Sequence, residues 1–199
     1  LRVWWKNFLE TIPPALESGA RYVEVTLSAP LETCRLVAKY DLVLVKPDGQ
    51  FLIYDWKTSA HRPRRNWLSE RMQTRIYPYL LVTAGAALNG GRPVPPEAVQ
   101  MIYWFADPQM QPETFAYSQA RWKDDDLSLR ELVNELVNLP QQDFSRAPSE
   151  QPCRFCVYRS LCGRGTQAGK IGSEDQPEFD GTAADSLDFD LEQISEVSF

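Results

Sequence analysis

Two aspartates and a lysine occur in two neighbouring segments whose apolar residues alternate or run together as in β-strands. Asp41 lies within residues 36–45, and Asp55 and Lys57 stand at the end of the next such segment. Because side chains alternate along a strand, Asp55 and Lys57 share one face and Trp56 points to the other. Two carboxylates can hold Mg²⁺ or Mn²⁺, and a lysine can orient the activated water or offset charge at phosphorus. This set suits hydrolysis of a phosphodiester bond, although a plain ion pair on a strand surface has the same residue types.

The turn between these two segments decides whether the carboxylates meet. Pro47-Asp48-Gly49 is a strong hairpin signal. If the hairpin closes with Lys46 opposite Gln50, Asp41 lies across from Asp55, with Cβ atoms about 4.5–5.5 Å apart. The backbone carbonyl of Trp56 would then be a further metal ligand. A shift by one residue would place Asp41 opposite Trp56 and spoil the site.

A polar stretch follows within a predicted helix over residues 64–88, which contains Pro78. Gln73 and Tyr77 are spaced to share one helix face, where an amide and a hydroxyl could hold water or a phosphate. The alternative places Tyr77 in the core and Gln73 in solvent. Several arginines crowd around this stretch and could bind the DNA backbone or simply form a solvated face; they are Arg62, Arg64, Arg65, Arg71 and Arg75.

Three of the four cysteines, Cys153, Cys156 and Cys162, lie within ten residues at ligand-like spacing. In a chain of this length the pattern favours a metal site in a reducing cytoplasm over a disulfide scaffold. Zinc with a fourth ligand and an iron–sulfur cluster both fit, because the spacing does not separate them.

The net charge of −6 is unevenly placed. Residues 171–199 hold nine acidic residues and no Lys or Arg, so subtracting nine from the 27 acidic residues leaves 18 against 21 basic ones in residues 1–170. We therefore expect a mildly basic folded domain over 1–170, with a cysteine loop at 151–165, and a disordered acidic tail over 171–199. The sequence has no Gly-rich phosphate loop and no apolar run long enough to span a bilayer.

The order of expected elements indicates an α/β fold, a mixed sheet flanked by helices. Helices are expected near residues 1–18, 64–88 and 124–139, and strands at 22–27, 36–45, 51–56, 99–106 and 113–118.

The ordered set of motifs resembles the PD-(D/E)XK nuclease superfamily, and within it the RecB-like, Cas4-like branch that carries an iron–sulfur cluster. The resemblance runs from Tyr22 to Cys162 and implies a restriction-endonuclease-like fold. It implies that Asp41, Asp55 and the Trp56 carbonyl bind Mg²⁺ or Mn²⁺, that Lys57 is catalytic, and that Gln73 and Tyr77 support the site. It also implies that Cys153, Cys156 and Cys162 hold a structural 4Fe–4S cluster.

Two parts of that branch's pattern are absent. No histidine precedes Asp41, and no cysteine lies near the N-terminus. Because the chain begins with Leu1 inside a predicted helix, we expect a segment ahead of it to carry both. Cys34 is the alternative fourth cluster ligand.

The resemblance implies a metal-dependent DNA nuclease, an exonuclease acting on single strands or ends in DNA repair, recombination or CRISPR-type processing. A helicase or a CRISPR-type protein is the expected partner, in the cytoplasm. The alternative is a catalytically incomplete DNA-binding or helicase-partner module of the same fold.

Overall fold

A computed structural model describes residues 2–12, 16, 18–58, 62–140, 145–149, 153, 156 and 158–164. These residues fall into two compact units, 2–134 and 135–164. The expected acidic tail, 171–199, lies outside the described residues, as does the end of the expected domain at 170.

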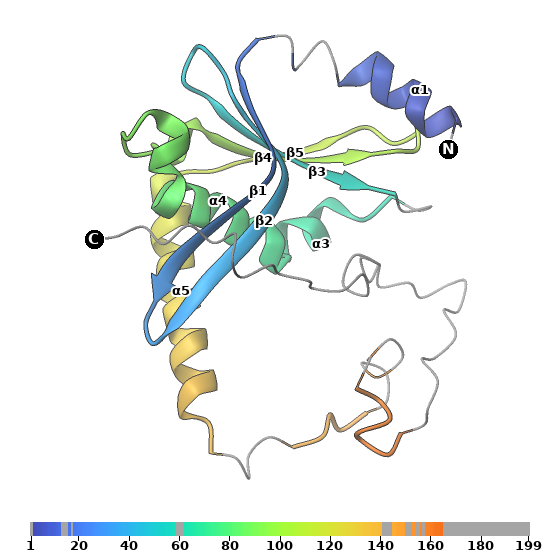
Figure 1. Cartoon of the computed structure of the whole chain (residues 1–199). Helices are drawn as coiled ribbons and strands as arrows, with labels where there is room; N and C mark the ends of the chain where they lie inside the picture. The colour runs from blue at the N-terminus through green and yellow to red at the C-terminus, as the bar shows by residue number, and fades with distance from the viewer. Residues whose placement is uncertain are drawn as a thin grey trace. The chain divides into compact units, whose positions relative to one another are not determined.

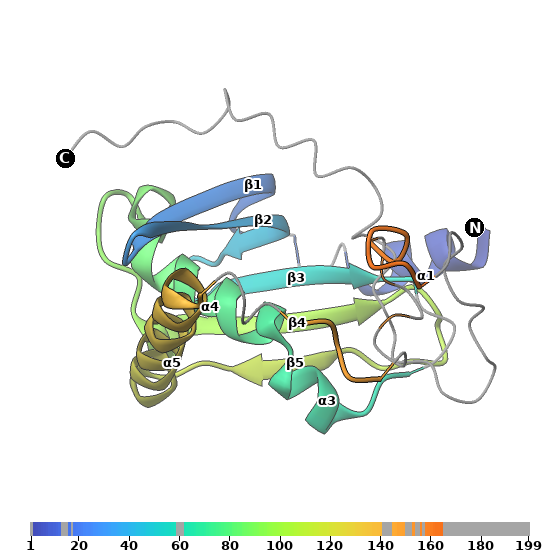
Figure 2. The same ribbon diagram turned by 90° about the horizontal axis from the view of Figure 1, so that it is seen from below.

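The first unit is built on a mixed sheet (Figures 1 and 2). Its strands are β1 (Ala20–Leu31), β2 (Cys34–Val45), β3 (Phe51–Lys57), β4 (Val99–Phe105) and β5 (Glu113–Ala116). They lie side by side in chain order, and only the pair of β3 with β4 is parallel. The predicted mixed sheet flanked by helices is confirmed, with β3 buried along nearly its whole length.

Helices cover both faces of this sheet. The described helices are α1 (Arg2–Thr11), α3 (Arg65–Glu70), α4 (Met72–Ala84) and α5 (Gln119–Asn138), with short 3-10 turns η1 (Gly85–Asn89) and η2 (Pro96–Ala98). None of the helices in the described ranges is both long and apolar enough to cross a membrane. Their apolar sides form two clusters, one on each side of the strands.

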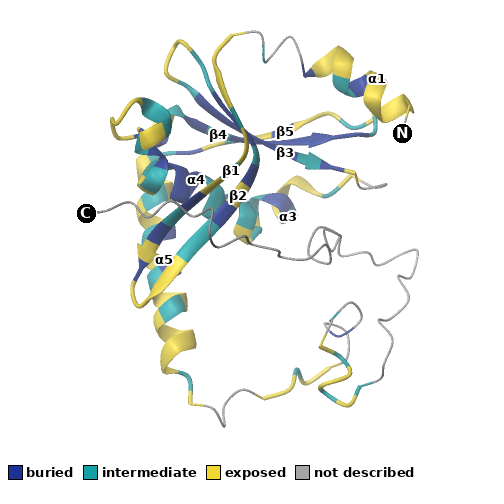
Figure 3. Cartoon of the chain, in the orientation of Figure 1, coloured by how far each residue is buried: buried dark blue, intermediate teal, exposed yellow. Residues whose placement is uncertain are grey.

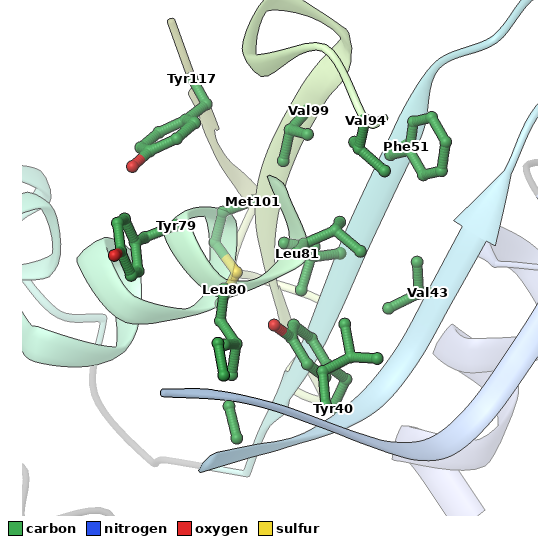
Figure 4. Close-up of a cluster of buried hydrophobic side chains, with 14 of the residues drawn as sticks. Tyr40, Val43, Phe51, Tyr79, Leu80, Leu81, Val94, Val99, Met101 and Tyr117 are labelled. Atoms are coloured by element: carbon green, nitrogen blue, oxygen red, sulfur yellow. The ribbon is translucent and has the colours of Figure 1, made fainter. Parts of the chain in front are cut away.

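The larger cluster lies between α4 and the sheet. Leu80 and Leu81 of α4 point toward Tyr40, Val43 and Met101 of the strands (Figure 4). A smaller cluster on the other face joins α1 to the strands. The central strands are consequently buried on both sides, whereas much of α1 is exposed (Figure 3).

The helix predicted over residues 64–88 is divided. Arg71 has an extended backbone, with ψ of 141°, and separates α3 from α4, whereas Pro78 lies inside α4. The side chain of Thr74 donates a hydrogen bond to the Leu68 carbonyl at the end of α3. The Arg71 guanidinium lies 4.6 Å from the centre of the Trp67 ring. The Thr74 hydroxyl thus gives the Leu68 carbonyl a donor at the break, close to the start of α4, which carries Gln73.

Candidate active site

The hairpin of β2 and β3 has the register that its turn predicts. Lys46 and Gln50 close it with a backbone hydrogen bond of 2.8 Å, and Gly49 has a φ of +85°. The ladder then runs from Val45 opposite Phe51 to Leu42 opposite Tyr54. Asp41 and Asp55 would form the next pair, but the ladder stops before them.

Beyond the last paired residues of β2 and β3, the side chain of Asp41 bonds to the backbone of β3. In this register the Trp56 N–H would donate to the Tyr40 carbonyl, since residues two positions apart repeat the same hydrogen-bonding role. Instead, the Trp56 N–H donates to Asp41 Oδ2 at 2.8 Å. The N–H and C=O of a strand residue point toward the same edge, so the Trp56 carbonyl lies on the side that Asp41 occupies. The carboxylate of Asp41 is thereby fixed against the backbone directly after Asp55.

Asp55, Lys57 and Gln73 form a closed polar triangle. Lys57 Nζ lies 2.6 Å from Asp55 Oδ2, and the two side chains are only 7% and 5% exposed. Lys57 Nζ also donates to Gln73 Oε1 at 3.2 Å, and Gln73 Nε2 donates to Asp55 Oδ1. The amide of Gln73 therefore holds the ammonium and the carboxylate together, as its predicted place opposite the strands requires.

Tyr77 stands one helix turn after Gln73 on α4 and contacts the residue that precedes Asp41. Its ring packs on the Tyr40 ring with centroids 4.8 Å apart, and its carbonyl accepts the Tyr40 hydroxyl at 2.9 Å. Burial raises the pKa of Tyr40 well above its ordinary value, and the nearby Tyr77 adds to this. The contacts of Tyr77 join α4 to β2 next to Asp41.

A family comparison agrees with this geometry. Residues 2–163 match the model of the PD-(D/E)XK nuclease superfamily. The chain belongs to this superfamily. No curated protein matches its sequence.

Two solved structures are similar in shape. SSO0001 is 14% identical over 81% of this chain and 67% of its own, with a TM-score of 0.48. A protein described as a candidate exonuclease from Eubacterium rectale is 9% identical over 86% of this chain, with a TM-score of 0.49. The chain spans only 61% of the length of the second protein.

PD-(D/E)XK nucleases generally use Mg²⁺ or Mn²⁺, and the donors at this site suit either ion. Asp41, Asp55 and the Trp56 carbonyl offer only oxygen atoms, which these ions prefer. Within the described ranges, no three or more His, Cys, Asp or Glu side chains gather closely enough to hold a metal. Two carboxylates are nevertheless enough for Mg²⁺, which usually keeps several waters and takes further oxygens from a substrate phosphate.

Sequence reasoning missed two residues next to the triangle, Tyr103 on β4 and Thr74 on α4. Tyr103 of β4 pairs with Asp55 in the parallel ladder, and its ring centre lies 5.4 Å from Lys57 Nζ. Its hydroxyl shares a 2.7 Å hydrogen bond with Thr74, whose own proton goes to the Leu68 carbonyl. Burial is the main reason that the pKa of Tyr103 is raised far above 10. The hydroxyl therefore stays protonated at neutral pH and donates to Thr74.

Glu113 was also missed. It pairs with Tyr103 across β4 and β5, is buried, and forms ion pairs with Arg62 and Arg65. Arg65 also donates to the Thr114 carbonyl at 2.8 Å. Burial alone would raise the pKa of Glu113, but the hydrogen bonds and charges of the two arginines outweigh it and lower this pKa below 4.5.

The other predicted DNA-binding arginines lie in different surroundings. Arg75 Nε pairs with the buried Asp125 at 2.8 Å, and its Nη2 donates to Ser128 at 2.6 Å, which ties α4 to α5. Arg71 stacks on Trp67, and Arg64 is exposed at the start of α3. Arg75 thus has a clear role in joining two helices.

The structure describes all four cysteines, although several residues around the last three lie outside the described ranges. Cys153 is buried and Cys156 and Cys162 are half-buried in the second unit, and Arg164 donates to Cys153 Sγ at 3.1 Å. The described cysteines form no group of three that could hold a metal. Cys34 is exposed at the start of β2 in the first unit.

Proposed function

We propose that this member of the PD-(D/E)XK superfamily hydrolyses phosphodiester bonds in DNA with Mg²⁺ or Mn²⁺ held by Asp41, Asp55 and the Trp56 carbonyl. The observation that carries the proposal is the position of the Asp41 carboxylate. It sits on the Trp56 N–H, directly beside the buried triangle of Asp55, Lys57 and Gln73.

Each side chain then has a defined task. The bound ion supplies a polarised phosphoryl oxygen and a water of lowered pKa. Asp55 is held in one orientation by Gln73 on one oxygen and by Lys57 on the other. Lys57, with its charge screened from solvent by burial, orients the attacking water and offsets charge on the phosphoryl group. Gln73 keeps Lys57 next to Asp55 through its carbonyl.

In the proposed nuclease, the two arginines that pair with Glu113 contact the substrate. Asp55, Tyr103 and Glu113 are successive partners across three strands, so their side chains share one sheet face. Arg62 and Arg65 are 47% and 55% exposed although both are paired with Glu113. A guanidinium that is fixed in place binds a phosphate with two parallel hydrogen bonds. These two arginines are suited to the backbone of a DNA strand or end whose scissile phosphate lies at Asp55.

The finer assignment to the RecB-like, Cas4-like branch is part of the same proposal, with a 4Fe–4S cluster on Cys153, Cys156 and Cys162 and a role in DNA repair or CRISPR-type processing. The order of the motifs supports it. Anaerobically purified protein should contain iron and sulfide and absorb visible light. A colourless protein with stoichiometric zinc would refute the cluster and with it this branch.

The nuclease proposal is tested with labelled single- and double-stranded DNA in Mg²⁺, Mn²⁺ or EDTA. We expect cleavage that EDTA abolishes and that Asp41→Asn and Asp55→Asn each reduce by about 10³-fold or more, since each removes a charged ligand. Asp48→Asn makes the same chemical change at the turn of the same hairpin and should leave the rate unchanged. DNA binding without turnover in either metal, or activity that survives Asp55→Asn, would refute the proposal.

A further inference from the structure

One rung is missing from the otherwise regular ladder of β1 and β2. The pairs run from Ala20 opposite Val45 to Val23 opposite Leu42, and they resume at Val25 opposite Tyr40. The offset is the same on both sides of the gap, so no residue has been inserted. The missing rung is Glu24 opposite Asp41. Glu24 has a φ of +53°, in the left-handed region that side chains other than glycine seldom adopt.

Both strands exchange faces at this rung. Residues three apart on a regular strand lie on opposite faces. Yet Tyr40 and Val43 on β2 both belong to the cluster beneath α4, and Tyr22 and Val25 on β1 both pack against that cluster. The two strands therefore turn over together between these positions, and Asp41 lies within the turnover.

The turnover explains why Asp41 behaves unlike its neighbours. In an unbroken strand, Asp41 would point to the same face as Val43, and Tyr40 would offer its carbonyl to Trp56. Instead, the Asp41 carboxylate takes the place of that carbonyl as the acceptor for the Trp56 N–H. We infer that Glu24 is a positioning residue, whose left-handed backbone keeps Asp41 out of the β1–β2 ladder and aims its carboxylate at Trp56. The catalytic consequence rests on the proposed function, whereas the positioning itself does not.

The proposed role of Glu24 depends on its left-handed backbone and not on its side chain. It forms an ion pair of 2.7 Å with Lys39, and both side chains are more than half exposed. Such pairs contribute little to stability. The pKa of Lys39 is raised mainly by its hydrogen bond to Glu24 and the charge of Glu24, with a smaller contribution from the charge of Asp41. A glycine, which adopts positive φ without a steric penalty, should therefore replace Glu24 without harm.

The test compares Glu24→Val, Glu24→Ala and Glu24→Gly. A β-branched side chain strongly resists positive φ, alanine resists it less, and glycine does not. Glu32→Val is the matched control, because Glu32 has nearly the same φ, +52°, but stands in the turn between β1 and β2. Two quantities are measured for each variant: the exchange protection of the Trp56 amide, and the Mn²⁺ concentration that gives half-maximal cleavage.

We expect Glu24→Val to lower the protection of the Trp56 amide about tenfold and to raise the Mn²⁺ requirement about 10- to 100-fold, as loss of an orienting partner does at metal sites. Both quantities for Glu24→Ala should lie between those of Glu24→Val and Glu24→Gly. The alanine variant therefore keeps the series informative if the valine variant does not fold. Glu24→Gly and Glu32→Val should match the unmodified chain in both quantities.

Three outcomes would overturn the inference: unchanged Trp56 protection in Glu24→Val and Glu24→Ala, equal losses in the Gly and Val variants, or the same loss in Glu32→Val. If Trp56 protection follows the series but no variant, nor the unmodified chain, cleaves DNA, the positioning stands and the proposed nuclease fails. If all variants cleave DNA normally and the Trp56 amide has the same protection in each of them, only the positioning role of Glu24 is refuted.

Discussion

The two ends of the β2–β3 ribbon use the same contact for different purposes. At the turn, the Asp48 carboxylate accepts the Gln50 N–H at 3.1 Å, and at the open end the Asp41 carboxylate accepts the Trp56 N–H at 2.8 Å. Asp48 is exposed and pairs with Lys46 in a stretch that only reverses the chain. Asp41 stands beside the buried Asp55 and Lys57. The same contact thus stabilises a turn in one place and holds a proposed metal ligand in the other, and the neighbouring side chains decide which.

Among changes that keep both carboxylates, the largest effect is expected at the open end, from Lys57→Met, which removes the ammonium but keeps most of the side-chain volume. Cleavage should fall by about 10²- to 10³-fold because transition-state charge is no longer offset. Mn²⁺ should bind more tightly, because Lys57 no longer competes for Asp55 Oδ2. Single-turnover cleavage and calorimetric Mn²⁺ binding measure the two changes, and weaker Mn²⁺ binding would contradict this account of the triangle.

Gln73→Ala should have the next largest effect. It removes the amide that holds both Asp55 and Lys57, so cleavage should fall about 10- to 100-fold, as for other residues that orient metal ligands. Gln73→Glu should be worse, since a second carboxylate would face Asp55. Rates at saturating metal give the comparison, and a Gln73→Ala rate equal to that of the unmodified chain would remove Gln73 from the site.

At the turn, a change should affect stability and leave cleavage alone. A Cβ on Gly49 meets nothing within 4 Å, so only its φ of +85° opposes Gly49→Ala. The cost should be about 1 kcal/mol of the free energy of unfolding. Urea unfolding measures this loss. A fall in the cleavage rate well below the melting temperature would show that the two ends are not independent.

The smallest effect concerns pH and a third acid on the sheet, Glu113. Its pKa lies below 4.5 in the folded chain, so its stabilising contribution is complete above about pH 4.5. That contribution is lost as the pH falls through the lower, folded pKa. Glu113→Gln should therefore be less stable than the unmodified chain by about 1 kcal/mol or less at pH 6, because its arginine partners are half exposed. The difference should shrink as the pH falls below about 4.5 in unfolding experiments, and a constant difference would contradict the pairing.

The sequence predicts those parts of the fold and the site that depend on turns and on short-range periodicity. The turn at Pro47-Asp48-Gly49 fixes the hairpin register, and alternation along β3 places Asp55 and Lys57 on one face. The spacing of Gln73 on a helix brings its amide to them.

The rest depends on contacts that no local pattern contains. More than 40 residues separate Lys57 from the start of β4, so the parallel register that brings Tyr103 beside Asp55 has no sequence signal. The helix break at Arg71 occurs without glycine or proline there. Glu24 likewise adopts positive φ where neither glycine nor asparagine marks it, so the turnover of β1 and β2 at Asp41 is not visible in the sequence.

The most direct test measures Mn²⁺ binding to the unmodified chain, Asp41→Asn, Asp55→Asn and the double variant. If one ion is shared, the unmodified chain should bind one Mn²⁺ at this site, each single change should weaken it at least about tenfold, and the double change should cost less than the two losses added together. Two strictly additive losses, or a site that persists with full affinity in either single variant, would show that Asp41 and Asp55 do not hold the same ion.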